Sequence, residues 1–231
     1  MNIHRLSLIE GAASATGAVA VVDTFRAYST AAYLFDRGLA RLILTSTLDE
    51  ARTVSTTIPG SLLCGEDEGR RPADFDLGNS PGEVQARDDL HGKTVVLRTS
   101  AGTRCLLAAF DNGARPIYAA SLVVASATAR ALASSATATI VASGWGGTKP
   151  ADEDEATADL IAASIRDPRV VPAQRTALVE QIRAGPGARR LRAAEWAHGD
   201  DLALCLDIDA FPFAMRAAQR RGAVELERVE I

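Results

Sequence analysis

The chain has 231 residues, 47% of them hydrophobic, so it can bury a proper core rather than stay disordered. The formal net charge is −4, the pI is near 5.5, and there is no long Lys/Arg run, which argues against a nucleic-acid surface. No apolar run of about 18 residues could span a bilayer, and the first residues lack the apolar core of a signal peptide. We therefore expect a cytoplasmic protein with neither a nucleic acid nor a membrane as partner.

The cysteines and histidines argue against two further classes of protein. The three cysteines are odd in number and widely spaced, which suits a reducing compartment and no disulfide framework: Cys64, Cys105 and Cys205. The three histidines show no paired spacing, so a zinc site is not expected. The distribution of histidines also argues against a Ser/His/Asp hydrolase, because none lies near Ser29, Thr30 or Cys105 in sequence.

The first clear element is a buried strand at Val19–Val22 that runs into a polar turn and a helix. Asp23 and Arg26 follow the strand, and the Ala/Leu/Phe-rich helix ends at Gly38, a suitable C-cap. The free N–H groups at a helix start stabilise an anion, and an Arg fork can grip phosphate or carboxylate. Asp23 could hold a hard cation, so this turn is interpreted as a phosphate-handling loop.

The elements that follow alternate between strands and helices. In chain order, we expect a strand at Arg41–Thr45, a helix over 48–56 opened by a capping box, a strand at Ser61–Cys64, an acidic loop at Gly65–Gly69, and a helix that starts at Ser80-Pro81. Ser80 and Glu83 fit the cap of that helix, and Asn79, just before it, is the better candidate to face a ligand.

The pattern then repeats. Thr94–Leu97 is a strand, Arg98–Arg104 a polar turn and Cys105–Phe110 a helix, and a shift of 75 residues lays the first unit on the second. This indicates an internal duplication, the alternative being chance similarity between two Ala-rich units. We expect one domain over 1–231, with related halves at about 19–90 and 94–166 and a C-terminal extension over 167–231.

The second half ends in a third strand and several helices. We expect a strand at Ala138–Ser143, a glycine loop at Gly144–Gly147, helices over about 153–166, 172–184 and 187–197, a helix from Asp200-Asp201 through Cys205, and short strands at Phe211–Ala214 and Ala223–Val229 joined by Arg-rich exposed sequence. Trp145 in the glycine loop could line a pocket, or belong to an interface or the core.

Alternating strands and helices predict an α/β fold: three α/β/α layers around a largely parallel or mixed sheet. Ligands of such sheets lie outside the carboxyl ends of the strands. Here those ends carry Asp23–Arg26, Gly65-Glu66, Arg98-Thr99 and Ser143-Gly144, all polar or glycine-rich. The sequence therefore predicts one shared site.

Two acidic clusters could contribute to that site. Glu66, Asp67 and Glu68 follow a strand and are either magnesium ligands or a solvated turn. The run Asp152–Glu155 could bind metal through Glu153 and Asp154, but carboxylates in a first helical turn also complement the helix dipole.

With these segments in place, the chain resembles the 2-phosphosulfolactate phosphatase family of coenzyme M biosynthesis, from about Val19 to Val229. The resemblance rests on five segments: Val22–Thr30, Gly65-Glu66 through Phe75–Pro81, Arg98–Arg104, Glu153-Asp154, and Asp201–Cys205. It implies a magnesium-dependent cytoplasmic hydrolase of phosphate esters on 2-hydroxy acids, with an α/β/α fold.

Four positions depart from that family's pattern. Tyr28 stands where a small residue is usual, Asp67 replaces an arginine, Ala101 an asparagine and Asp159 a glycine. The loss of a cation and an amide would change how a strongly anionic substrate is recognised. A related phosphorylated metabolite is thus a more cautious expectation than the coenzyme M precursor.

The sequence thus predicts metal-assisted hydrolysis of a phosphate monoester. Asp23, Arg26 and Glu66 are the expected catalytic residues, and Mg²⁺ is expected on some of Asp23, Glu66, Glu153 and Asp154. The expected substrate-binding residues are Ser29, Thr30, Asn79, Ser80, Thr99, Thr103, Arg104 and Gly144. The competing hypothesis is a phosphate- or carboxylate-binding protein of the same fold with an eroded site, and a homodimer is the default assembly.

Overall fold

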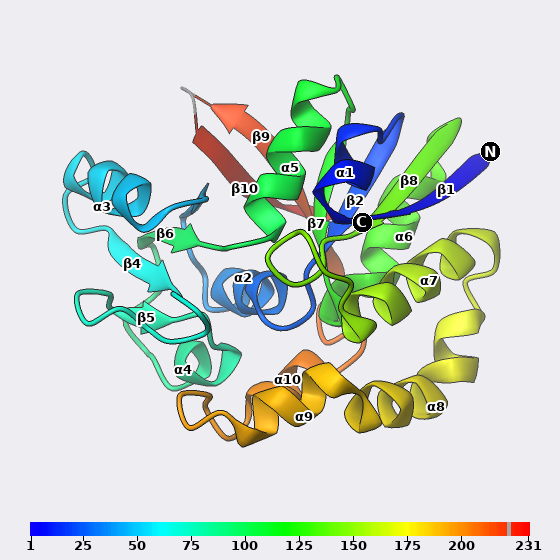
Figure 1. Ribbon diagram of the computed structural model, residues 1–231. Coiled ribbons are helices and arrows are strands. Elements are labelled where there is room, and N and C mark those ends of the chain that lie inside the picture. Colours follow the sequence, from blue (N-terminus) through cyan, green and yellow to red (C-terminus); the bar gives the residue numbers. More distant parts are fainter. Residues whose placement is uncertain (221–222) are drawn as a thin grey trace.

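In the computed structural model, which describes residues 1–220 and 223–231, ten strands form one mixed sheet between two layers of helices (Figure 1). The strand order is β1-β8-β2-β7-β9-β10-β3-β6-β4-β5. The strands are β1 (Asn2–Ser7), β2 (Ala18–Val22), β3 (Arg41–Thr45), β4 (Leu62–Gly65), β5 (Leu77–Gly78), β6 (Thr94–Arg98), β7 (Ile117–Ala120), β8 (Thr137–Ala142), β9 (Phe213–Arg220) and β10 (Ala223–Glu230). The predicted three-layer α/β/α fold is confirmed.

The helices divide between the two faces of the sheet. One face packs on α1 (Leu8–Ala13), α2 (Ala27–Asp36), α4 (Pro81–Gln85) and α5 (Gly102–Asp111). The other packs on α3 (Leu48–Thr56), α6 (Ala125–Ala133), which a short 3-10 helix at Leu122–Val124 precedes, and α7 (Asp152–Arg166). The next helix, α8 (Val170–Ala184), packs on α7. None of the helices in the described ranges is long and apolar enough to cross a membrane.

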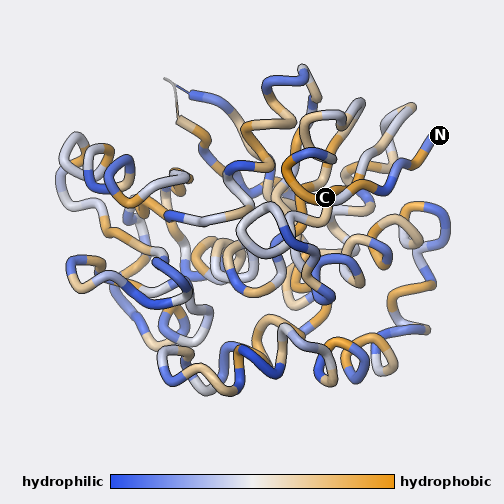
Figure 2. Tube along the Cα trace, viewed as in Figure 1, coloured by the Kyte–Doolittle hydropathy of each residue, from blue (hydrophilic) through white to orange (hydrophobic). Residues whose placement is uncertain are grey.

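The apolar strands follow from burial on both sides. In β2, Val19 and Val21 contact the layer of α2 and α5, whereas Ala20 and Val22 contact the layer of α6 and α7. Because successive side chains point to opposite faces, a strand covered on both faces has no polar alternation. Figure 2 shows the resulting concentration of hydrophobic residues along the central strands.

The C-terminal strands differ from the prediction. The expected short strands are eight-residue strands, β9 and β10, whose antiparallel hairpin lies between β7 and β3 at the centre of the sheet. The sequence expected to be an exposed connection is therefore mostly strand, and its residues 221–222 lie outside the described part of the chain. Within the hairpin, Arg216, which lies opposite Tyr118 of β7, pairs across the strands with Glu227 at 2.7 Å. Charged residues of this kind interrupt the apolar pattern by which a strand is predicted from sequence.

The sheet order is palindromic under the predicted repeat. Exchanging β2 with β6, β3 with β7 and β4 with β8 turns the order β8-β2-β7 on one side of the hairpin into β4-β6-β3 on the other. Adding 75 to the bounds of α2 gives those of α5. This arrangement agrees with the expected duplication of a β–loop–α–β–α unit, which stays a prediction.

Three helices form a C-terminal arm, defined here as residues 170–205: α8, α9 (Pro186–Ala193) and α10 (Asp201–Cys205). In Figure 1 the arm, yellow to orange, runs below the sheet from α7 to α4. Its far end is tied to α4, because the backbone N–H of Gly82 donates to Asp201 Oδ1 at 3.0 Å. The arm thereby covers the carboxyl ends of the strands.

Candidate active site

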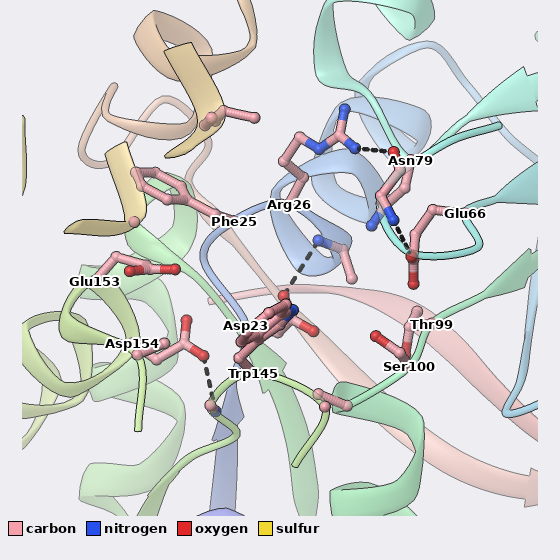
Figure 3. Close-up of a pocket in the computed structure, with 18 of the residues that line it drawn as sticks. Asp23, Phe25, Arg26, Glu66, Asn79, Thr99, Ser100, Trp145, Glu153 and Asp154 are labelled. Atoms are coloured by element: carbon pink, nitrogen blue, oxygen red, sulfur yellow. Dashed lines mark hydrogen bonds between the residues drawn. The ribbon is translucent and has the colours of Figure 1, made fainter. Parts of the chain in front are cut away.

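A pocket lies between the carboxyl ends of β2, β4, β6 and β8 and the C-terminal arm (Figure 3). It encloses about 810 Å³, part of it open to solvent. Each of the four strands contributes one residue at or just past its end: Asp23, Glu66, Thr99 and Gly144. The convergence expected from the order of the elements is therefore present in the fold.

Asp23 follows β2 and is almost fully buried. Its Oδ1 accepts the backbone N–H of Ala27 at 3.3 Å, at the start of α2. Burial, together with the nearby carboxylate of Asp154, raises the pKa of Asp23 to about 8. This carboxyl group is thus held in a site that disfavours its negative charge.

The first turn of α7 brings Glu153 and Asp154 into the same pocket, and their surroundings differ. Asp154 accepts the backbone N–H groups of Thr24 at 2.7 Å and Gly144 at 3.0 Å, and the hydroxyl of Ser143 at 3.2 Å. Burial raises the pKa of Asp154, but these donors restrict the rise to about 6. The α7 start is thereby tied to the β2 and β8 turns.

Glu153 has no such support. Its Oε2 is buried and has no hydrogen-bond partner among the described residues. Burial, and next the charge of Asp154, raises the pKa of Glu153 to about 9. A buried, unpartnered acceptor beside two other acids is an arrangement that a bound cation would compensate.

The acids of this pocket could provide some, but not all, of the ligands of a cation. Within residues 1–220 and 223–231, no three His, Cys, Asp or Glu side chains are gathered as a ready metal site. Mg²⁺ needs only one or two carboxylates, because it keeps waters and takes substrate phosphate oxygens as its remaining ligands. Asp23, Glu153 and Asp154, which line one pocket, therefore supply the carboxylate oxygens that this ion prefers.

Arg26 lines the pocket but its guanidinium is already held. It is paired with Asp201 at 2.8 Å, donates to the carbonyl of Gly69 at 2.9 Å, and stacks on the Trp196 ring at 4.6 Å from the centroid. Both partners of the ion pair are buried. Asp201 also accepts the hydroxyl of Ser80 at 2.6 Å. The arm thus fixes Arg26 and the start of α4 through one carboxylate.

Glu66 is balanced by its own donors. Its Oε1 accepts from Arg98 at 2.9 Å and its Oε2 from the backbone N–H of Gly69 at 2.7 Å. Arg98 also donates to the Glu66 carbonyl. Both Glu66 oxygens therefore already accept hydrogen bonds within the protein, as both Asp154 oxygens do.

Neutral donors and acceptors line the opposite wall. Thr99 precedes α5, and its Oγ1 accepts the N–H of Thr103 at 2.9 Å. Ser100 and Ala101 line the pocket at the start of the helix, and no hydrogen bond from their backbone N–H groups occurs in the described part. Asn79 is 6% exposed, and its Oδ1 also lacks a partner there. The free N–H groups of Ser100 and Ala101 can bind an oxyanion, whereas Asn79 Oδ1 can only accept a hydrogen bond.

Five of the expected substrate-binding residues lie outside the pocket lining: Ser29, Thr30, Ser80, Thr103 and Arg104. Ser29 is buried and donates to the Thr24 carbonyl at 2.9 Å, and Thr30 is fully buried, because α2 begins at Ala27 and carries both into the helix layer. Ser80 caps α4 and binds Asp201. Thr103 binds Thr99, and the exposed Arg104 donates to the Gly146 carbonyl at 3.3 Å. They support the site from behind or beside it.

The structure adds residues that the sequence interpretation did not place there. Phe25, Trp196 and Arg190 line the pocket, whereas Asp201 and Arg98 hold residues that line it. The sequence predicts a family-like segment and a helix start at Asp201–Cys205, but it does not predict that Asp201 pairs with Arg26. In the acidic loop, Glu68 lines the pocket, and Asp67 instead pairs its backbone with Arg70.

The sequence of this chain is similar to known proteins over most of its length. A profile of the family described as 2-phosphosulpholactate phosphatase matches residues 3–219. A protein of Deinococcus radiodurans named "Probable 2-phosphosulfolactate phosphatase" is 38% identical over 198 residues, which covers 82% of this chain and 80% of the relative. A protein of Bacillus subtilis with the same name is 29% identical over 217 residues, 91% of each chain. The family match therefore spans the pocket and the whole C-terminal arm.

Proposed function

Because this chain belongs to the 2-phosphosulpholactate phosphatase family, we propose that it is a magnesium-dependent phosphatase that hydrolyses the phosphate monoester of a small anionic metabolite, such as a 2-phospho-2-hydroxy acid. Membership of this family makes it a phosphoric monoester hydrolase. Magnesium and the substrate class are the parts that we propose.

The observation that carries the magnesium proposal is the buried, unpartnered Oε2 of Glu153 beside Asp23 and Asp154. Asp23, Glu153 and Asp154 would hold the ion, with Glu66 at the edge of the set. When bound, the ion would polarise the phosphoryl group and help to position the attacking water. The raised pKa values of the three acids show that burial disfavours their negative charges, which a bound cation would stabilise.

The chain's own residues supply the rest of the oxyanion site. The backbone N–H groups of Ser100 and Ala101, at the positive end of α5, would bind phosphate oxygens, and the Asn79 amide would orient the substrate. Arg26, held by Asp201, adds fixed positive charge in the wall without having to reorganise. Water would attack phosphorus, and the ester oxygen would leave as the hydroxyl of the metabolite.

Phosphate release from 2-phospholactate, 2-phosphosulfolactate and 4-nitrophenyl phosphate tests this function. We expect release with Mg²⁺ that stops on addition of EDTA, and a loss of about 100-fold or more in kcat for Asp23→Asn. Asp111→Asn is the matched control, since Asp111 is exposed and lies outside the pocket. EDTA-resistant release, or full activity in Asp23→Asn, would contradict the magnesium mechanism. Saturable binding with no release would favour the non-catalytic alternative.

Cytoplasmic location and a homodimer also stay predictions. Sedimentation of the purified chain, with and without substrate, tests whether it forms a homodimer.

A further inference from the structure

Two Arg–Trp stacks line the pocket. Arg26 lies over the Trp196 ring at 4.6 Å from its centroid, and Arg190 lies over the Trp145 ring at 4.5 Å. All four residues line the pocket. An arginine stacked by its flat face still has its N–H donors in the plane of the guanidinium, so the stack leaves the edge available for hydrogen bonds.

The two arginines differ in what their edges contact. Both terminal nitrogens of Arg26 are used within the protein, one by Asp201 and the other by the Gly69 carbonyl. Arg190 makes no ion pair or hydrogen bond to any residue in the described ranges, and its side chain is exposed. Arg26 is therefore part of the wall, whereas Arg190 presents an open anion-binding edge.

The positions of the two charges set a direction for a bound substrate. The carboxylates proposed to hold the ion are buried, Glu153 at 3% exposure and Asp23 at 8%, whereas Trp145 is 56% exposed. A phosphate at the buried end would leave the remainder of the metabolite toward Arg190 and Trp145. Two-point binding of this kind requires a second anion on the substrate.

We propose that Arg190, held by Trp145, is the specificity-determining residue that binds the second anionic group of the substrate, a carboxylate or sulfonate close to the phosphate ester. This inference rests on the proposed phosphatase function and names the part of the site that selects the substrate. The glycine loop after β8 and helix α9, which are distant in sequence, contribute one half each.

Arg190→Gln tests the assignment, because it removes the charge and keeps a polar side chain of similar reach. Charge-assisted hydrogen bonds to a carboxylate predict that the ratio of kcat/KM for 2-phospholactate to that for 4-nitrophenyl phosphate falls about 10- to 100-fold, mainly through KM. Arg190→Lys, which keeps charge but loses the fork, is expected to recover only part of this ratio. An unchanged ratio overturns the proposal.

Two control variants separate this role from general charge or packing. Arg192→Gln changes a residue on the same helix that lies outside the pocket lining. Lys149→Gln removes a cation that lies 5.5 Å from the Trp145 ring; Lys149 itself does not line the pocket. Both should keep the parent ratio. A fall of similar size in either control would show that net charge, rather than Arg190 itself, sets the preference.

Calorimetric binding keeps the test independent of turnover. In the parent, 2-phospholactate should bind more tightly than inorganic phosphate, and Arg190→Gln should weaken 2-phospholactate about 10-fold or more relative to phosphate. If the parent binds but does not hydrolyse, the proposed function fails and the Arg190 assignment stands. Equal weakening of both ligands, or no binding of either by the parent, overturns the assignment.

Discussion

Neutralising Glu153 should stabilise the metal-free protein while it impairs catalysis. Its Oε2 is buried with no partner in the described residues, and its pKa is raised from 4.5 to about 9 by burial and by Asp154. Glu153→Gln removes the ionisation and keeps the shape. Active-site acids that are costly in the free enzyme are a familiar source of such a trade-off between stability and activity.

The sign and size follow from proton linkage. With a raised pKa, folded Glu153 keeps a proton that the unfolded chain releases, so its contribution to stability falls as pH rises from about 4.5 to about 9. The slope for one group is about 1.4 kcal/mol per pH unit, which gives about 4 kcal/mol at pH 7.5 for an isolated acid. Because Asp23 and Asp154 share the site, we expect Glu153→Gln to gain about 2–4 kcal/mol there and little at pH 4.5.

Urea unfolding of both proteins in EDTA, from pH 5 to pH 9, measures this difference. Asp154→Asn is the opposing control, because Asp154 accepts two backbone N–H groups and a hydroxyl that an amide cannot match. We expect that variant to gain nothing or to lose about 1–3 kcal/mol. A Glu153→Gln protein with the parent's pH dependence, or less stable than the parent at pH 8, would refute the reasoning.

Two further predictions concern the arm and the ion. Asp201→Asn should lower the free energy of unfolding by about 3 kcal/mol, because it leaves Arg26 buried without its counter-charge. The control Asp207→Asn, which breaks the exposed pair with Arg175, should lower it by less than about 1 kcal/mol. Equal losses in urea titrations would show that the buried pair contributes no more than the exposed one. Mg²⁺ at about 100 times its Kd should stabilise the parent by about 2.7 kcal/mol, a thermal shift of about 5–10 °C, and the shift should vanish in Asp23→Asn. A shift of the same size in that variant would place the ion elsewhere.

The elements that the sequence predicted well carry local signals. The helix over 48–56 was expected from its capping box, and Thr47 Oγ1 does accept the N–H of Glu50 at 3.1 Å. The apolar strands were found because burial on both faces leaves continuous runs of valine, leucine and isoleucine. The β9–β10 hairpin was underestimated because charged residues such as Arg216 and Glu227 interrupt the apolar pattern of its strands.

The site was predictable where topology alone decides it. Parallel strands deliver their carboxyl ends to one edge, so Asp23, Glu66, Thr99 and Gly144 could be grouped without any knowledge of side-chain geometry. Which residue of a turn faces the ligand was not predictable in the same way. Ser29 and Thr30 looked like anion-binding groups, yet where α2 begins determines that they point into the helix layer.

The C-terminal arm explains why the remaining features required the fold. Its residues reach the pocket from far along the chain: Asp201 pairs with Arg26, and Gly187 packs on Glu153 so closely that an added Cβ would lie 2.1 Å from Oε2. Glycine at 187 therefore lets the arm seal the acidic end of the pocket, and this sealing removes water from Glu153 and raises its pKa. The same helix carries Arg190 to the open end of the pocket. One segment thus buries the carboxylate proposed to bind a cation and also carries the arginine proposed to bind an anion, and it lies outside both halves of the predicted repeat.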